Sequence, residues 1–162
     1  MMLHKETRTT ETDILSLQGI PILLKIFLAM DGSMTRLLAL TMGAPVVAEI
    51  TPGEKGERRV FLGTSHYPKL ILASSCLTDG GDYQKTWEIL KDPRPIGTVF
   101  AERGEFMIRE DLSISKRDGT PLIPDPWQGH SLWMRSSILS NMDGVRISIQ
   151  EIFLPQLIDF IS

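Results

Sequence analysis

Cysteine is nearly absent from this chain of 162 residues, which has Cys76 alone. A single cysteine excludes an internal disulfide and a metal cluster built from several cysteines. It also fits a protein of the reducing cytoplasm, where thiols stay reduced. The three histidines, His4, His66 and His130, lack the spacing of metal ligands, so no metal site is expected.

Long apolar runs and basic runs are also lacking. The longest apolar stretch, residues 20–30, is broken by Pro21 and Lys25 and is too short to span a bilayer. Residues 1–12 are polar without an apolar centre, unlike a signal peptide. Lys and Arg number 17 against 20 Asp and Glu, and the net charge is -3. We therefore expect neither a membrane span nor a nucleic-acid partner.

What is present suits a globular domain. Hydrophobic residues make up 42% of the chain and charged residues 23%, which are ordinary values for a chain that buries one core. We expect residues 13–162 to form a single domain, preceded by a flexible lead over residues 1–12.

The periodicity predicts helices first and strands afterwards. Apolar spacing indicates helices from about Ile14, from Pro21 to Met30 and from Met34 to Met42, the last capped by Ser33. From there the period changes to that of strands, with two short helical insertions. The predicted strands cover residues 45–51, 58–62, 69–77, 105–115, 130–140 and 146–154. The predicted insertions cover residues 84–91 and 95–100. Gly43 is expected to stop the helix that begins at Met34, and Gly104 the second insertion. Residues 116–129 read as a loop, and the apolar tail 156–162 is expected to pack on the body.

These elements indicate an α+β fold with a single, mostly antiparallel sheet of about six strands. In the last strand Val145, Ile147, Ile149, Glu151 and Phe153 share one face. Glu151 is thus expected to point inward, where a carboxylate needs a cation or hydrogen-bond donors, or becomes protonated. The simpler explanations are a bulge that returns it to water, or a structural ion pair.

A second charged group is expected on an inner face. Arg58 alternates with Val60 and Leu62, and its planar fork suits a carboxylate ligand. Ser33-Met34-Thr35 opens a helix, where free backbone N–H groups also favour an anion. An arginine, a helix start and a buried acid would suit a small ligand with a carboxylate at one end and a hydroxyl or ether at the other. Alternatively, Arg58 and Glu151 pair with each other.

Five sequence blocks stand in order between Gly19 and Pro155 and resemble those of one family. They are Asp31-Gly32-Ser33-Met34-Thr35, Arg58-Arg59-Val60-Phe61-Leu62, Arg94-Pro95-Ile96-Gly97, Trp133-Met134-Arg135-Ser136-Ser137 and Glu151-Ile152-Phe153-Leu154-Pro155. Together they resemble the chorismate lyase family, including its archaeal and mycobacterial branch. Two departures stand out: Ala73 occupies a position where the bacterial enzymes carry arginine, and residues 78–93 differ.

The resemblance implies an enzyme that converts chorismate to 4-hydroxybenzoate and pyruvate without metal or cofactor. It implies a highly curved antiparallel sheet with helices that close an internal cavity. Arg58 and the backbone N–H of Met34, flanked by Ser33 and Thr35, would hold the ring carboxylate. Ile96 would line the wall. Glu151 would contact the ring hydroxyl and, with a raised pKa, act as a general acid.

Other functions fit the same residues. The fold also resembles the effector-sensing UTRA domain of transcription regulators, which would make the protein a non-catalytic binder of small aromatic acids. A regulator is disfavoured because no basic helical arm precedes the sheet. A lyase could also give a different product, such as 3-hydroxybenzoate. In a purely structural domain, Arg58 and Glu151 would simply pair. The expected partner is a small molecule, and no protein partner is predicted.

Overall fold

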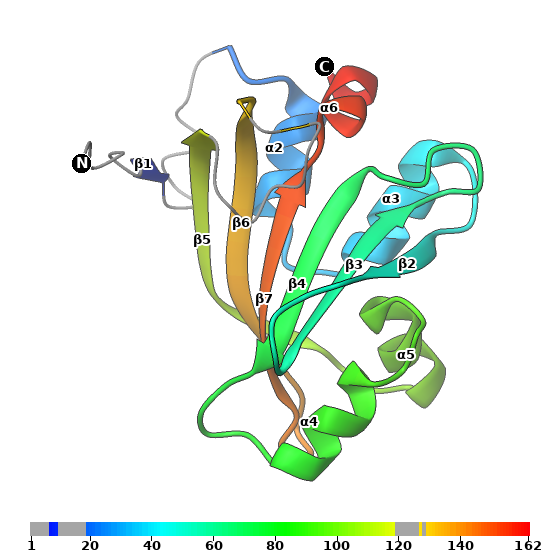
Figure 1. The fold of residues 1–162 in the computed structure, drawn as a ribbon, viewed down its shortest axis with the longest axis vertical. Coiled ribbons are helices and arrows are strands. Elements are labelled where there is room, and N and C mark those ends of the chain that lie inside the picture. Colours follow the sequence, from blue (N-terminus) through cyan, green and yellow to red (C-terminus); the bar gives the residue numbers. More distant parts are fainter. Residues whose placement is uncertain (1–6, 10–18, 119–126, 128) are drawn as a thin grey trace.

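The computed structural model describes residues 7–9, 19–118, 127 and 129–162. In this part of the chain one antiparallel sheet is accompanied by five helices (Figure 1), which confirms the predicted α+β class. The strands are β1 (Thr7–Thr9), β2 (Val47–Thr51), β3 (Glu57–Gly63), β4 (Ile71–Leu77), β5 (Ile108–Asp118), β6 (Ser131–Ser140) and β7 (Arg146–Phe153). The helices are α2 (Ile22–Ala29), α3 (Met34–Met42), α4 (Tyr83–Leu90), α5 (Ile96–Arg103) and α6 (Pro155–Ile161).

The sheet has the strand order β1-β5-β6-β7-β4-β3-β2, and every neighbouring pair is antiparallel. The seventh strand is the short β1, which pairs with β5 through Thr7 and Lys116. The sequence placed Thr7–Thr9 in a flexible lead, and the structure gives these three residues as a short strand. Three polar residues are too few to show the alternation of a strand. Their pairing partner, β5, lies more than 100 residues further along the chain.

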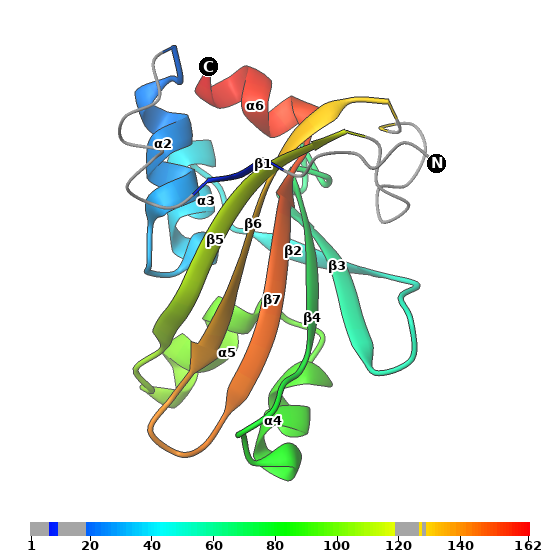
Figure 2. The same cartoon turned by 90° about the vertical axis from the view of Figure 1, so that its left-hand side faces the viewer.

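Two apolar clusters fill the inner face of the sheet. The upper core joins α2, α3 and α6 to the sheet, and the lower core joins α4 and α5 to it. Figure 1 shows α2 and α6 towards one end of the strands and α4 at the other, and Figure 2 shows the strands curving beside these helices. The upper core contains Leu24, Phe27, Leu28, Met34, Leu38, Val60, Leu62, Leu70, Ile71, Ala73, Ile114, Phe153, Leu157 and Ile161. The lower core contains Ile89, Leu90, Ile96, Val99, Phe100, Leu139, Val145, Ile147 and Ile149.

The helix boundaries follow from local chemistry. The Ser33 side chain accepts a hydrogen bond from the backbone N–H of Arg36, as predicted for the start of α3. Gly43 ends α3 at φ 64°, and Gly104 ends α5 at φ 65°, a left-handed conformation that glycine adopts without steric cost. The sequence predicts both glycines as helix stops, and the structure confirms this.

Some boundaries differ from the prediction. Strand β4 begins at Ile71, two residues later than expected, and β5 continues to Asp118, so residues 116–118 are strand and not loop. The tail forms α6 and buries Leu157 and Ile161, as its apolar composition indicated. The helix predicted from Ile14 begins outside the described residues. The longest described helix, α3, has nine residues, far fewer than a bilayer crossing requires, and no described helix could make that crossing.

Candidate functional site

A polar seam crosses the inner face of the sheet between the two cores. Cross-strand pairing places Ile114, Arg135, Glu151, Ala73 and Val60 directly opposite one another in a single row. Paired residues in an antiparallel sheet point to the same face, so this row points inward with Val60 of the upper core. Charged groups therefore stand within an otherwise apolar surface.

The next row towards the lower core is also partly polar. It places Arg58, Ser75, Ile149 and Ser137 opposite one another across β3, β4, β7 and β6. Ser75 is 1% exposed, and its hydroxyl has no hydrogen-bond partner among the described residues. Two adjacent rows thus supply two arginines, an acid and hydroxyl groups to one buried strip.

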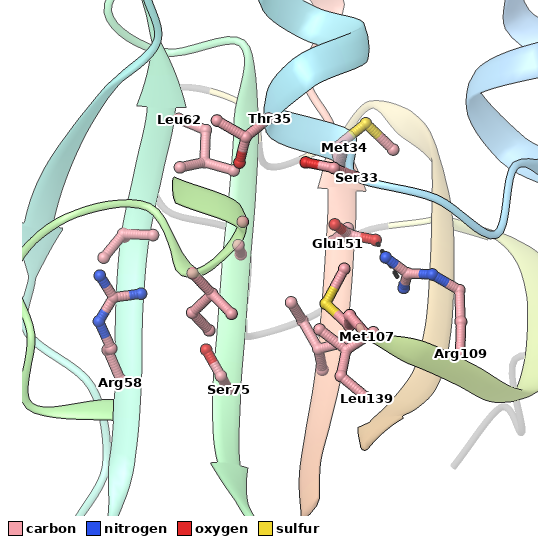
Figure 3. Close-up of a pocket in the computed structure, with 15 residues that line it drawn as sticks. Ser33, Met34, Thr35, Arg58, Leu62, Ser75, Met107, Arg109, Leu139 and Glu151 are labelled. Carbon is pink, nitrogen blue, oxygen red and sulfur yellow. Dashed lines mark ion pairs between the residues drawn. The ribbon is translucent and has the colours of Figure 1, made fainter. Parts of the chain in front are cut away.

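A pocket lies over this seam and is bordered by the first turns of α3 and α5. Figure 3 shows Ser33, Met34 and Thr35, at the start of α3, above Glu151. Its cavity volume is about 30 Å³, and part of the pocket is open to solvent. All six residues singled out from the sequence line it: Ser33, Met34, Thr35, Arg58, Ile96 and Glu151. They come from α3, β3, α5 and β7, so the fold brings together residues that the chain separates by more than 100 positions.

Glu151 is 2% exposed and has two guanidinium neighbours. Arg135 Nε donates to its Oε2 at 2.5 Å, and Arg109 Nη1 lies 3.6 Å from the same oxygen. The Arg135 side chain is fully buried and also donates to the carbonyl oxygens of Phe27 and Met30, at 3.1 and 2.7 Å. Arg135 therefore joins β6 and β7 to the end of α2, and Glu151 is its only carboxylate partner among the described residues.

This environment keeps Glu151 ionised. Burial alone raises the pKa of its carboxyl, but the charges of Arg135 and Arg109, together with the hydrogen bond from Arg135, outweigh burial and hold the pKa below 4.5. The expectation of a raised pKa, and with it a proton stored on Glu151 at neutral pH, is therefore wrong. The alternative of a bulge is wrong as well, because Glu151 stays in register with Arg135 and Ala73.

Arg58 reaches the pocket from β3 and does not pair with Glu151. Its Nη2 donates to the carbonyl oxygens of Asp92 and Arg94, at 3.1 and 2.7 Å, in the turn that precedes α5. Burial lowers the pKa of Arg58, partly offset by the charge of Asp92. Among the described residues no carboxylate lies within 4 Å of its guanidinium, and its buried Nε has no partner. Arg58 thus binds the turn before α5 through Nη2, while its Nε has no hydrogen-bond partner among the described residues.

Two helix starts meet above the seam. The N–H of Arg36 is capped by Ser33, which leaves the N–H groups of Met34 and Thr35 without an acceptor within α3. Gly97 in the first turn of α5 allows this meeting, because a Cβ there would lie 2.6 Å from Ser33 Oγ. Both helix starts carry partial positive charge, so they add to the attraction that Arg58 offers an anion.

Arg135 was missed as a site residue although the sequence contained a signal for it. The turn after β6 pairs Ser140 with Arg146, and the same register puts Arg135 opposite Glu151. Counting residues back from the turn of the predicted hairpin pairs Arg135 with Glu151. The register of a hairpin fixes which residues stand opposite each other and which face they share. Its place in the Trp133–Ser137 block did not by itself indicate this role.

Arg109 was missed because a bulge changes its face. In β5, Arg109 pairs with Leu139 and Ile114 with Arg135, and the register shifts between Glu110 and Ser113. Asp111 has φ 52° at this irregularity. A regular strand with Ile114 facing inward would direct Arg109 outward, so the extra residue returns Arg109 to the pocket. No pattern in the sequence marks that bulge.

The charge of the seam is not balanced. Arg58, Arg109 and Arg135 contribute three positive charges, and Glu151 contributes the one buried negative charge among them. Two less buried acids also act on these arginines: Asp31, which is exposed, on Arg109, and Asp92, which is half-buried, on Arg58. A desolvated excess of positive charge is costly without an anion nearby, so the pocket is suited to an anionic ligand.

No protein-family model matches this chain, and a search of curated proteins finds no match to its sequence.

Proposed function

We propose that this protein is a chorismate lyase-like enzyme that releases pyruvate from chorismate and leaves 4-hydroxybenzoate. The observation that carries the proposal is the convergence of Ser33, Met34, Thr35, Arg58, Ile96 and Glu151 on one pocket. The resemblance selected these residues from separate blocks of the chain. A chance similarity of short blocks gives no reason for their side chains to meet.

In this proposal the ring carboxylate is held at the Arg58 side of the pocket. The free part of its guanidinium and the N–H groups of Met34 and Thr35 are the donors. Ile96, which is 8% exposed, covers the ring, and Gly97 lets the two helix starts close around the carboxylate. The ligand then replaces water around a buried cation that lacks a carboxylate partner.

Glu151 acts as an acceptor. Because its pKa is lowered, it is ionised at neutral pH and accepts a hydrogen bond from the hydroxyl at C4 of the ring. Loss of the C4 proton and of the enolpyruvyl group at C3 makes the ring aromatic, which drives the reaction. The C3–O bond breaks, and the departing enolpyruvate gains a proton on its methylene carbon to become pyruvate, so the elimination has no net change in protons. The protein has mainly to orient the ring, exclude water and stabilise the negative charge of the departing oxygen, and the excess of guanidinium groups suits that last task.

The second candidate is a non-catalytic protein that binds an aromatic acid. It is favoured by the pairing of Glu151 with Arg135 and Arg109, which gives the pocket no resting proton donor. An aromatic carboxylate would occupy the same donors without any bond being broken.

The test is to mix purified protein with chorismate and follow pyruvate and the aromatic acids together. Equal release of pyruvate and 4-hydroxybenzoate, abolished in Arg58→Met, supports the lyase. Equal release of pyruvate and 3-hydroxybenzoate keeps the lyase and corrects its product. If neither is released and 4-hydroxybenzoate raises the melting temperature, the binding protein replaces the enzyme.

A further inference from the structure

Two arginines contact Glu151, but only one of them lines the pocket. Arg135 is engaged by Glu151 and by two carbonyl oxygens, and it stands behind the pocket wall. Arg109 lines the pocket, and its side chain is 2% exposed. Since Arg135 already neutralises Glu151 at 2.5 Å, Arg109 is the surplus cation of the pair.

Arg109 is only partly engaged. Its Nη1 donates to Ser137 Oγ at 2.5 Å, and its Nη2 lies 3.5 Å from the carbonyl oxygen of Gly32. Its Nε is buried and has no partner among the described residues. A guanidinium has five N–H groups, so Arg109 keeps donors for a ligand while Ser137 fixes its position.

Arg109 and Arg58 stand on opposite sides of the pocket (Figure 3). Arg109 comes from β5 and Arg58 from β3, with β6, β7 and β4 between them. Ala73, directly opposite Glu151, carries no polar group into the space between. Two cations at the two ends of one buried strip match a ligand with two separated negative groups.

We propose that Arg109 is a specificity-determining residue that binds the second carboxylate of a small dicarboxylate whose first carboxylate is held by Arg58. This rests on the proposed function, because chorismate carries one carboxylate on the ring and another on the enolpyruvyl group. The bulge at Asp111 is needed for this contact, because the extra residue places the Arg109 side chain in the pocket.

A matched pair of ligands tests this independently of turnover. One is benzoate with an enolpyruvyl ether at C3, which has two carboxylates and is already aromatic, so it cannot react. The other is 3-methoxybenzoate, which keeps the ring carboxylate and the ether oxygen alone. The wild type is expected to bind the dicarboxylate at least about tenfold more tightly, as one charge-assisted contact allows. Calorimetric titration measures both affinities.

Arg109→Met is expected to remove this preference and to change the affinity for 3-methoxybenzoate by less than about threefold. Arg109→Lys keeps the positive charge but not the planar guanidinium, and it is the safer variant for folding. Its preference for the dicarboxylate should fall between those of the wild type and Arg109→Met. An undiminished preference in Arg109→Met, or in Arg109→Lys if the methionine variant does not fold, overturns the proposal. So does an equal weakening of both ligands, or a wild type that binds neither.

Failure of the lyase and failure of this inference give different results. If the wild type prefers the dicarboxylate but releases no pyruvate from chorismate, the proposed lyase activity is wrong. The role of Arg109 in binding the second carboxylate then stands if Arg109→Met loses that preference. If the wild type turns over chorismate and Arg109→Met has the same KM, the lyase activity stands. The role of Arg109 in binding the second carboxylate is then wrong.

Discussion

At the scale of single residues, the site depends on one buried carboxylate among three arginines. Glu151 offsets the charge of Arg135, which cannot reach water, and part of the charge of Arg109. An isolated buried charge is far more costly than a paired one, so Glu151 stabilises the fold as well as facing the pocket. Any test of its chemistry must therefore separate stability from function.

Glu151→Gln should lower the free energy of unfolding by about 3 kcal/mol or more, because the buried Arg135 would lose its counter-ion. Urea unfolding at neutral pH measures this. Glu49→Gln is the matched control, since Glu49 is exposed on β2, and it should change the same quantity by less than about 0.5 kcal/mol. Equal effects of the two substitutions would show that the buried ion pair contributes little.

The pH dependence of stability follows from the direction of the same pKa shift. The pKa of Glu151 is lower in the folded chain than its ordinary 4.5, so its contribution is fully present above about pH 4.5. It is lost as the pH falls through the folded-state pKa. The difference in unfolding free energy between wild type and Glu151→Gln should therefore shrink as the pH is lowered from 7 to 3. A constant difference would mean that Glu151 does not titrate in this way.

At the scale of elements, the predictable parts are those with a regular period or a cap. Ser33, Gly43 and Gly104 stand at helix ends that were expected from the sequence. The alternation around Glu151 correctly predicted an inward face because β7 is regular along its length. The bulge in β5 was not predictable, because Asp111 lies in a polar stretch where one extra residue leaves no mark on the apolar pattern.

The backbone of Asp111 offers a direct test of that bulge. At φ 52° a β-branched side chain is strained and glycine is not. Asp111→Val should destabilise the fold by about 1–2 kcal/mol in urea unfolding, whereas Asp111→Gly should be neutral or slightly stabilising. The reverse order of the two variants would contradict a left-handed residue at this position.

The meeting of α3 and α5 is tested at Gly97. A Cβ there would lie 2.6 Å from Ser33 Oγ and 2.9 Å from Thr35 Oγ1, so Gly97→Ala must push the two helix starts apart. We expect a loss of about 1–3 kcal/mol in stability and a weaker affinity for 4-hydroxybenzoate. Gly32→Ala is the control, because a Cβ at Gly32 meets nothing within 4 Å. If both variants bind equally well, the close approach does not shape the pocket.

At the scale of the whole molecule, the pocket exists because two apolar cores cover the sheet and leave a polar seam between them. The sequence indicated the inward faces of Arg58 and Glu151, but not what each would contact. Their partners, Arg135, Arg109 and the carbonyl oxygens before α5, depend on register and on helix placement. Those are properties of the assembled sheet, and no single strand contains them.

The most direct measurement is a calorimetric titration of 4-hydroxybenzoate into wild type, Arg58→Met and Arg36→Met. Arg36 is the control, because it lies exposed on α3 and does not line the pocket. The account predicts one ligand per chain, an affinity at least about tenfold weaker in Arg58→Met, and no change in Arg36→Met. Absence of binding to the wild type, or an equal loss in both variants, would contradict an aromatic-acid pocket at this seam.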